Sequence, residues 1–275
     1  MVYVASLTGL LIGSGYGYVS QQGAFCMNSG FRVAVTQRNM TKVKAYVLAI
    51  ALQMVVVPLV FAAGLSSPTY PPLFPVGAVL GGLLFGAYPP LFPVGAVLGG
   101  LLFGASMHWA GGCAAGVWYK LGSGSLGALA AVLGMAIGAA ALEVGPLVGF
   151  RASVQSAGPS IGNAPLEMLW PWGPLAGLLL IGMLWFAAPG HAGAWSWRRT
   201  GLAIGAVGIL AWPLSSLAAR DFGMAVVPGT VSLLTEPVRR LMSWDVLFVL
   251  GIPLGAFVAA RRIGPVTASK VSAMT

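Results

Sequence analysis

The chain has 275 residues, of which 58% are hydrophobic and only 7% are charged, and its mean hydropathy is +0.90. Soluble globular domains carry about 25% charged residues, so this composition excludes an ordinary soluble domain and indicates a membrane protein. The net charge of +9 does not indicate nucleic acid as a partner, because the lysines and arginines lie in the connections between apolar runs. There they indicate orientation in a lipid bilayer.

About seven apolar runs follow one another along the chain. Each approaches the length of about 20 residues that a helix needs to cross a hydrocarbon core. The runs are continuously apolar, without the alternation of barrel strands, so we expect helices. They cover residues 1–20, 43–64, 91–119, 124–150, 168–188, 200–219 and 242–260. The sequence therefore predicts an all-α, multi-span integral membrane protein.

The basic residues predict how these helices are oriented. If the connection after the first run is cytoplasmic, ten basic residues lie on that side and four on the other. The four are Arg151, Arg220, Arg239 and Arg240. The ten are Arg32, Arg38, Lys42, Lys44, Lys120, Arg198, Arg199, Arg261, Arg262 and Lys270. Because cytoplasmic connections carry the excess of Lys and Arg, we expect the first helix to enter from outside.

One phrase, YPPLFPVGAVLGGLLFGA, occurs twice without a difference, at residues 70–87 and 88–105. Repeat architectures use longer, diverged units in about three or more copies, so we interpret this as a tandem duplication or an assembly error. The apolar core of the phrase has 12 residues and follows three prolines. It is too short to span a bilayer alone, and we expect a re-entrant or interfacial piece.

Both cysteines stand among small residues, Cys26 in QQGAFCMNSG and Cys113 in MHWAGGCAAG. Two cysteines imply no disulfide framework, and two buried apolar side chains are the structural alternative. Nearby glycines, however, allow a helix to bend or end inside the bilayer, which exposes amides and a thiol to a cavity. Such breaks mark binding sites in transporters. These glycines are Gly23, Gly111, Gly112 and Gly116.

Three stretches resemble the YeeE/YedE family of sulfur-compound transporters, whose characterised activity is thiosulfate import across the bacterial inner membrane. They are GSGYGYVSQQGAFCMNSGFR at 13–32, GGLLFGASMHWAGGCAAGVWYKLGSGSL at 99–126, and 199–232 with AWPLSSLAARDFG and PGTVS. The resemblance covers nearly the whole chain. It implies one membrane domain with two related halves, 1–150 and 168–275, and short broken or re-entrant helices.

The resemblance also implies which residues line the passage. Cys26 and Cys113 would be pathway thiols, and the substrate-binding set is Cys26, Cys113, Gln22, Gly23, Gly111, Gly112 and Gly116. The family's second half continues into another Gly-Gly-Cys helix, whereas only 13 residues follow Arg262 here. We therefore expect either a truncated second half or completion by another subunit, and favour truncation.

The expected function is transport of thiosulfate or a related sulfur anion, without enzyme activity, cofactor or metal. A charged dianion is costly to bury, and neutral thiols are weak S–H donors that could pass its terminal sulfur along. A soluble sulfurtransferase is a partner that the family implies. One alternative is covalent transfer, in which a cysteine holds a persulfide, for which His108 and Lys120 are poorly spaced from Cys113. Another is an inactive scaffold.

The remaining titratable residues leave further alternatives. His108 and His191 could join the cysteines as metal or haem ligands, but no ligand spacing supports this. Glu143 lies inside the fourth run and is either a proton-coupling group or an interfacial one. The other carboxylates, Glu167, Asp221, Glu236 and Asp245, are expected to be solvated. The sequence contains no P-loop motif, so ATP-driven transport would need another subunit.

Overall fold

The computed structural model describes residues 2–66, 93–156, 172–191, 193–220, 222–238 and 240–263. Within these ranges the chain is helical, and the only β feature is an isolated bridge between His191 and Ser196. The prediction of an all-α helical membrane protein is confirmed. The first copy of the duplicated phrase, Glu167, Asp221, Arg239 and the tail after Ile263 lie outside the described residues.

Most helices follow the predicted apolar runs, but two runs are divided, and the short helices α2 (Met27–Gln37) and α12 (Val227–Thr235) lie outside every predicted run. Residues 91–119 contain α5 and α6, and residues 124–150 contain α7 and the start of α8. The described helices are α1 (Val2–Gln22), α2 (Met27–Gln37), α3 (Thr41–Ala62), α5 (Pro93–Trp109), α6 (Ala114–Gly122), α7 (Leu126–Glu143), α8 (Val148–Ser156), α10 (Gly173–Trp185), α11 (Trp197–Ser216), α12 (Val227–Thr235) and α13 (Trp244–Ile263).

Length and hydropathy identify the helices best suited to a bilayer. Three helices in the described part of the chain are long and apolar enough to cross it, namely α3, α7 and Trp244–Arg262 of α13. Helix α10 is apolar but has only 13 residues. Because a hydrocarbon core of about 30 Å needs near 20 helical residues, α10 alone falls short of a full span.

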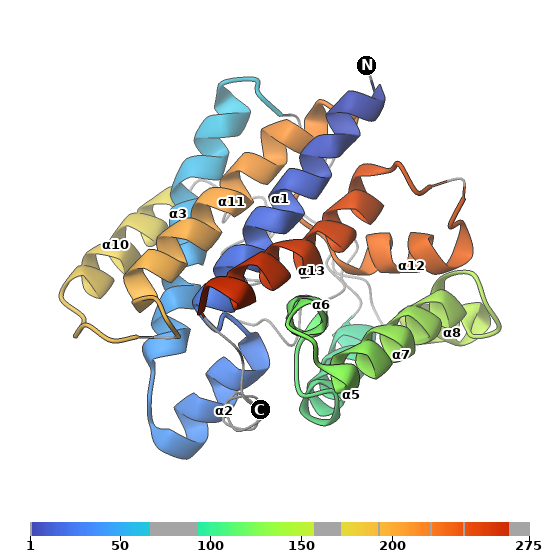
Figure 1. The fold of residues 1–275 in the computed structure, drawn as a ribbon, viewed down its shortest axis with the longest axis horizontal. Coiled ribbons are helices and arrows are strands. Elements are labelled where there is room, and N and C mark those ends of the chain that lie inside the picture. Colours follow the sequence, from blue (N-terminus) through green and yellow to red (C-terminus); the bar gives the residue numbers. More distant parts are fainter. Residues whose placement is uncertain are drawn as a thin grey trace.

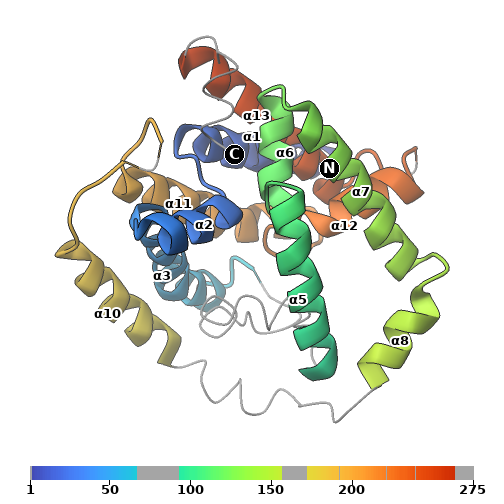
Figure 2. The ribbon, with the colours of Figure 1, turned by 90° about the horizontal axis from the view of Figure 1, so that it is seen from below.

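The long helices lie side by side in the order α10, α3, α11, α1 and α13 (Figure 1). Helices α1 and α11 are antiparallel, because Thr8 near the start of α1 bonds the carbonyl of Leu214 near the end of α11. At the other side of α13, α6 and α12 pack against it, and α7 packs against both of these short helices. Figure 2 shows α5, α6 and α7 from below, away from α3 and α10.

Helices α1 and α13 run parallel and approach each other more closely than ordinary side chains allow. Gly9, Gly13 and Gly17 are spaced by four residues and therefore share one face of α1. A Cβ atom at Gly13 would overlap the carbonyl of Phe248, and one at Gly17 would overlap that of Ile252. Small residues on one face are how helices reach close packing in membranes.

Candidate functional site

Two helix starts carry the two cysteines. Cys26 is the N-cap residue of α2 and Cys113 is the N-cap residue of α6, and both have the extended backbone typical of that position. The turn before Cys26 contains Ala24 with φ 45°, and the turn before Cys113 contains Gly111 with φ 65°. A positive φ ends a helix, so both predicted breaks are present in the structure, and the glycine at 111 adopts its angle without strain.

The thiols of Cys26 and Cys113 lie together against Gly116. A Cβ atom at Gly116 would lie 2.8 Å from the sulfur of Cys26 and 3.2 Å from the sulfur of Cys113. The two thiols are close enough to share a hydrogen bond, and both cysteines are free of disulfides. Cys26 is completely buried and Cys113 partly so. Gly116 thus leaves the space in which the two sulfurs meet.

Backbone amides surround this pair of thiols. The amides of Ser29 and Cys113 lie near the Cys26 thiol, and those of Met27 and Gly116 lie near the Cys113 thiol. Neither cysteine side chain caps its own helix with a hydrogen bond. The first amides of a helix have no partner within the helix, and they carry its partial positive charge. The site therefore presents N–H donors from two helix starts.

Two lysines lie beside the thiols. Lys42, in the first turn of α3, donates a hydrogen bond to the Ser29 hydroxyl at 3.0 Å. That hydroxyl donates to the carbonyl of Cys26, also at 3.0 Å. Lys120, in the last turn of α6, donates to the carbonyl of Gly111 at 2.6 Å. Lys42 is thus connected to the backbone of Cys26 through Ser29, and Lys120 contacts the backbone two residues before Cys113.

Tyrosines from three helices complete the surroundings of the thiols. Tyr119 of α6 is buried, Tyr16 of α1 and Tyr46 of α3 are half-buried, and all three lie near both cysteines. The ring of Tyr46 stacks on that of Phe25 with centroids 3.9 Å apart. The sequence did not mark these tyrosines or Lys42 as site residues, because only the fold brings them to the cysteines.

The other predicted site residues have different surroundings. The Gln22 carbonyl accepts hydrogen bonds from the amides of Ala194 and Trp195, and a Cβ at Gly23 would overlap the Thr200 side chain. Both therefore contact the start of α11 and the turn before it. Gly112 faces Val117, and Gly111 forms the bend. The structure groups Cys26, Cys113 and Gly116, while the other four predicted residues shape the two breaks.

The titratable residues outside the thiol site are mostly exposed. His108, His191 and Glu143 are exposed, and Glu143 is the last residue of α7. Within the described ranges, no three His, Cys, Asp or Glu residues are grouped as metal ligands would be.

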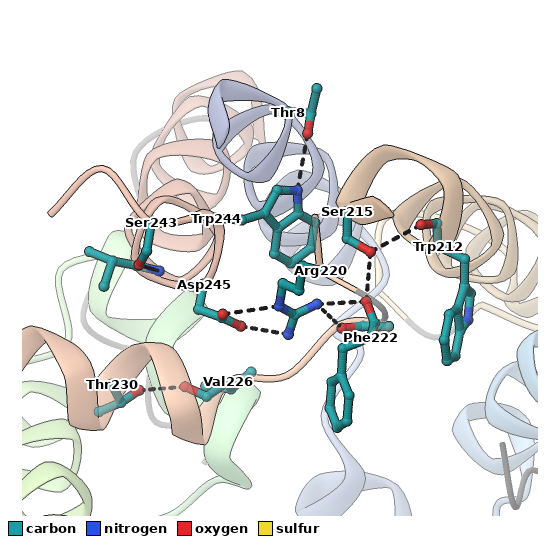
Figure 3. A network of polar contacts seen from close by, with 12 residues as sticks. Thr8, Trp212, Ser215, Arg220, Phe222, Val226, Thr230, Ser243, Trp244 and Asp245 are labelled. Atoms are coloured by element: carbon teal, nitrogen blue, oxygen red, sulfur yellow. Dashed lines mark hydrogen bonds and ion pairs between the residues drawn. The ribbon is translucent and has the colours of Figure 1, made fainter. Parts of the chain in front are cut away.

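Asp245 differs from its predicted solvated state. Its carboxylate forms a two-pronged ion pair with Arg220, with 3.0 Å between Oδ2 and Nε of the guanidinium (Figure 3). The side chains are only 23% and 14% exposed, respectively. The sequence placed Asp245 near a helix start, where a carboxylate is favourable. It could not predict the ion pair, because Arg220 lies 25 residues away along the chain.

Arg220 is the centre of a wider network. It donates to the carbonyls of Phe222 at 2.6 Å and Gly223 at 2.7 Å, and its guanidinium lies 4.6 Å from the ring centroid of Trp244. The Trp244 indole donates to the Thr8 hydroxyl at 3.0 Å. Figure 3 shows how these contacts join α1, the connection after α11, and the start of α13. The network fixes the connection that leads to α12.

Comparisons with known proteins agree with this architecture. A family model described as sulphur transport matches residues 22–88 and 87–273, and the two matches meet at the junction of the duplicated phrase. The chain is 31% identical to the thiosulfate transporter TsuA of Escherichia coli (strain K12), over 93% of this chain and 74% of that protein. It is 30% identical to the TsuA of Spirochaeta thermophila, over 94% of this chain and 78% of that protein.

Proposed function

Because the chain belongs to the YeeE/YedE sulphur transport family, we propose that it carries thiosulfate, or a related small sulfur-containing anion, across the bacterial inner membrane. It is a transport protein rather than an enzyme, as are the relatives named above. The observation that carries the proposal is the meeting of two thiols at two helix starts, with one glycine between them. Proton coupling through Glu143 is not needed for it.

The physical problem in this transport is the charge of the anion. A dianion has no partner in hydrocarbon, so its passage requires donors along the way. At the thiol site these donors are the S–H groups of Cys26 and Cys113 and the amides of the first turns of α2 and α6. A thiol is a weak donor, which lets an ion leave as easily as it arrives. The terminal sulfur would pass from one thiol to the next.

Two related halves would place such a site in the middle of the protein. The packing supports this division, since α1 lies beside α13 much as α11 lies beside α3, and α2 packs on α3 as α12 packs on α13. Each pair of long helices is parallel: Gly17 meets Ile252 in the first pair, and Gly201 meets Ala45 in the second. On this proposal, α2 and α12 are corresponding short helices. The anion delivered to the cytoplasm would suit a soluble sulfurtransferase.

Uptake of radiolabelled thiosulfate into cells that lack other importers tests the proposal. We expect uptake by the wild-type chain, loss in Cys26→Ala and Cys113→Ala, and partial retention in the Ser variants, because a hydroxyl also donates a hydrogen bond. Absence of wild-type uptake would reject transport and favour a scaffold role.

Mass spectrometry of protein purified after turnover separates the two sulfur chemistries. Hydrogen-bond transfer leaves Cys26 and Cys113 unmodified. In covalent transfer, a cysteine thiolate attacks the terminal sulfur of thiosulfate, the S–S bond of the anion breaks, sulfite leaves, and a persulfide remains on the cysteine. A persulfide, combined with inactive Ser variants, would replace the hydrogen-bond mechanism with the covalent one.

A further inference from the structure

Among the residues that the structure describes, no carboxylate forms an ion pair with the lysines of the thiol site. In the described part of the chain, the ion pairs are Arg220 with Asp245 and Arg240 with Glu236. Lys42 and Lys120 take part in neither, and their described partners are a hydroxyl and a carbonyl group. An ammonium group has three N–H donors, so one hydrogen bond to a neutral acceptor leaves capacity for an anion.

The two lysines act on the same small region. Lys42 lies near Cys26, Lys120 and Arg32, and Lys120 also lies near Cys26. Lys42 arrives from α3 through Ser29, whereas Lys120 arrives from the end of α6 through Gly111. Both are partly buried, while Arg32 is exposed. The pair of thiols therefore has a cation from each of two different helices.

Like charges held near each other in a partly buried place repel, and an anion between them relieves that repulsion. Thiosulfate has two chemically different ends, a terminal sulfur and three sulfonate oxygens. Thiols suit the terminal sulfur, whereas ammonium groups and helix-start amides suit the oxygens because charge-assisted hydrogen bonds are the stronger ones. The thiols and lysines together therefore match an anion that carries a terminal sulfur at one end and sulfonate oxygens at the other.

We propose that Lys42 and Lys120 bind the sulfonate oxygens of the anion while Cys26 and Cys113 contact its terminal sulfur, so that the lysine pair selects a doubly charged substrate. This inference rests on the proposed transport function. It assigns the sulfonate oxygens, which the thiols do not contact, to the two lysines. It makes Lys42 and Lys120 specificity-determining residues, one for each unit of negative charge.

The test compares Lys42→Gln and Lys120→Gln with Lys44→Gln as a matched control. Lys44 is on the same helix as Lys42, but its ammonium group reaches the carbonyl of Ala188. Each of the first two variants should raise the KM for thiosulfate roughly tenfold, the usual size for one hydrogen bond to a charged group, with little change in maximal rate. Lys44→Gln should leave KM unchanged.

A monoanion sharpens this test. Methanethiosulfonate keeps the terminal sulfur and replaces one sulfonate oxygen with a methyl group. Its apparent affinity, measured as competition with thiosulfate uptake, should fall less in the two glutamine variants than that of thiosulfate. Lys42→Arg and Lys120→Arg should recover most of the thiosulfate affinity. Equal losses for both anions, or an unchanged KM in the glutamine variants, would overturn the inference.

Calorimetric titration of purified protein with thiosulfate separates this inference from transport itself. Binding by the wild type that weakens in Lys42→Gln and Lys120→Gln, in protein that takes up no thiosulfate, would support the lysine site and reject the transport proposal. Binding of equal strength in wild type and both variants would reject the lysine site whatever the uptake. Melting curves in detergent identify any variant that fails to fold. If a glutamine variant does not fold, the thiosulfate affinity of the matching arginine variant is measured in its place.

Discussion

The thiol site and the Arg220 network use positive charge in opposite ways. The Arg220 guanidinium meets a carboxylate, two carbonyls and an aromatic face. In the described part of the chain, the hydrogen-bond partner of Lys42 is a hydroxyl group and that of Lys120 is a carbonyl group. A cation that is paired with a carboxylate stabilises the fold, because its charge is already balanced. A cation that is hydrogen-bonded to neutral groups can still attract an anion. The difference separates a structural region from a binding region in the same protein.

The two regions also differ in what their short helices face. Gly116 is the third residue of α6 and Gly229 is the third residue of α12. Gly116 faces two side-chain sulfurs, but a Cβ at Gly229 would overlap the carbonyl of Asp245. Cys113 stands at the start of α6, whereas Val226, which offers no polar side chain, stands at the start of α12.

Removal of the carboxylate from the Arg220 network should have the largest effect. Asp245→Ala leaves the guanidinium with carbonyl partners only, and we expect the free energy of unfolding to fall by roughly 2–3 kcal/mol, below the value for a fully buried pair because both side chains are partly exposed. Denaturant unfolding in detergent micelles measures this. Lys42→Ala, which breaks no ion pair in the described structure, should lose less than about 1 kcal/mol. Equal losses of stability in Asp245→Ala and Lys42→Ala would contradict the distinction between a structural cation and a binding cation.

An added methyl group at Gly229 should come next. Because the Cβ would overlap backbone that cannot rotate away, α12 or α13 has to shift, and we expect a loss of about 2 kcal/mol for Gly229→Ala. The same unfolding measurement applies. Gly104→Ala on α5 is the control, since nothing lies within 4 Å of the Cβ position there. A Gly229 variant as stable as this control would contradict the described packing of α12 on α13.

The same change at Gly116 should affect uptake more than stability. Its Cβ would press on two sulfurs, and thiol side chains can rotate, so we expect a loss of stability below about 1 kcal/mol. Thiosulfate uptake should nevertheless fall strongly, because the two thiols are pushed apart. Uptake and melting temperature are measured on the same preparations. Unchanged uptake would show that the two sulfurs do not act as a pair.

The exposed ion pair between Glu236 and Arg240 should contribute least. The side chains of Glu236 and Arg240 are 37% and 56% exposed, and exposed ion pairs contribute about 0.2–1 kcal/mol. Glu236→Gln should therefore change the free energy of unfolding by no more than this, and high salt should abolish the difference. A loss as large as that of Asp245→Ala would mean that exposure does not separate the two pairs.

Sequence patterns predicted the elements that depend on local chemistry. Apolar runs predicted the long helices but not the short α2 and α12, and the glycines before Cys113 predicted the break between α5 and α6. The two regions compared above could not be predicted, because they depend on contacts between distant residues. The close contact of the α1 glycines with α13 is one example, since it joins residues more than 230 positions apart. Likewise, Lys42 reads in sequence as an orientation charge, and only the fold brings it to Ser29.

The pairing of α1 with α13 has a consequence in time. Thr8 and Trp244, which bond each other, are separated by 236 residues. At a synthesis rate of about 5–20 residues per second, α1 waits roughly 10–50 s in the membrane before its partner exists. Cys26 shares one buried cluster with Phe248 and Ile252 of α13. The surroundings of this thiol are therefore completed late, after nearly all of the described chain has left the ribosome.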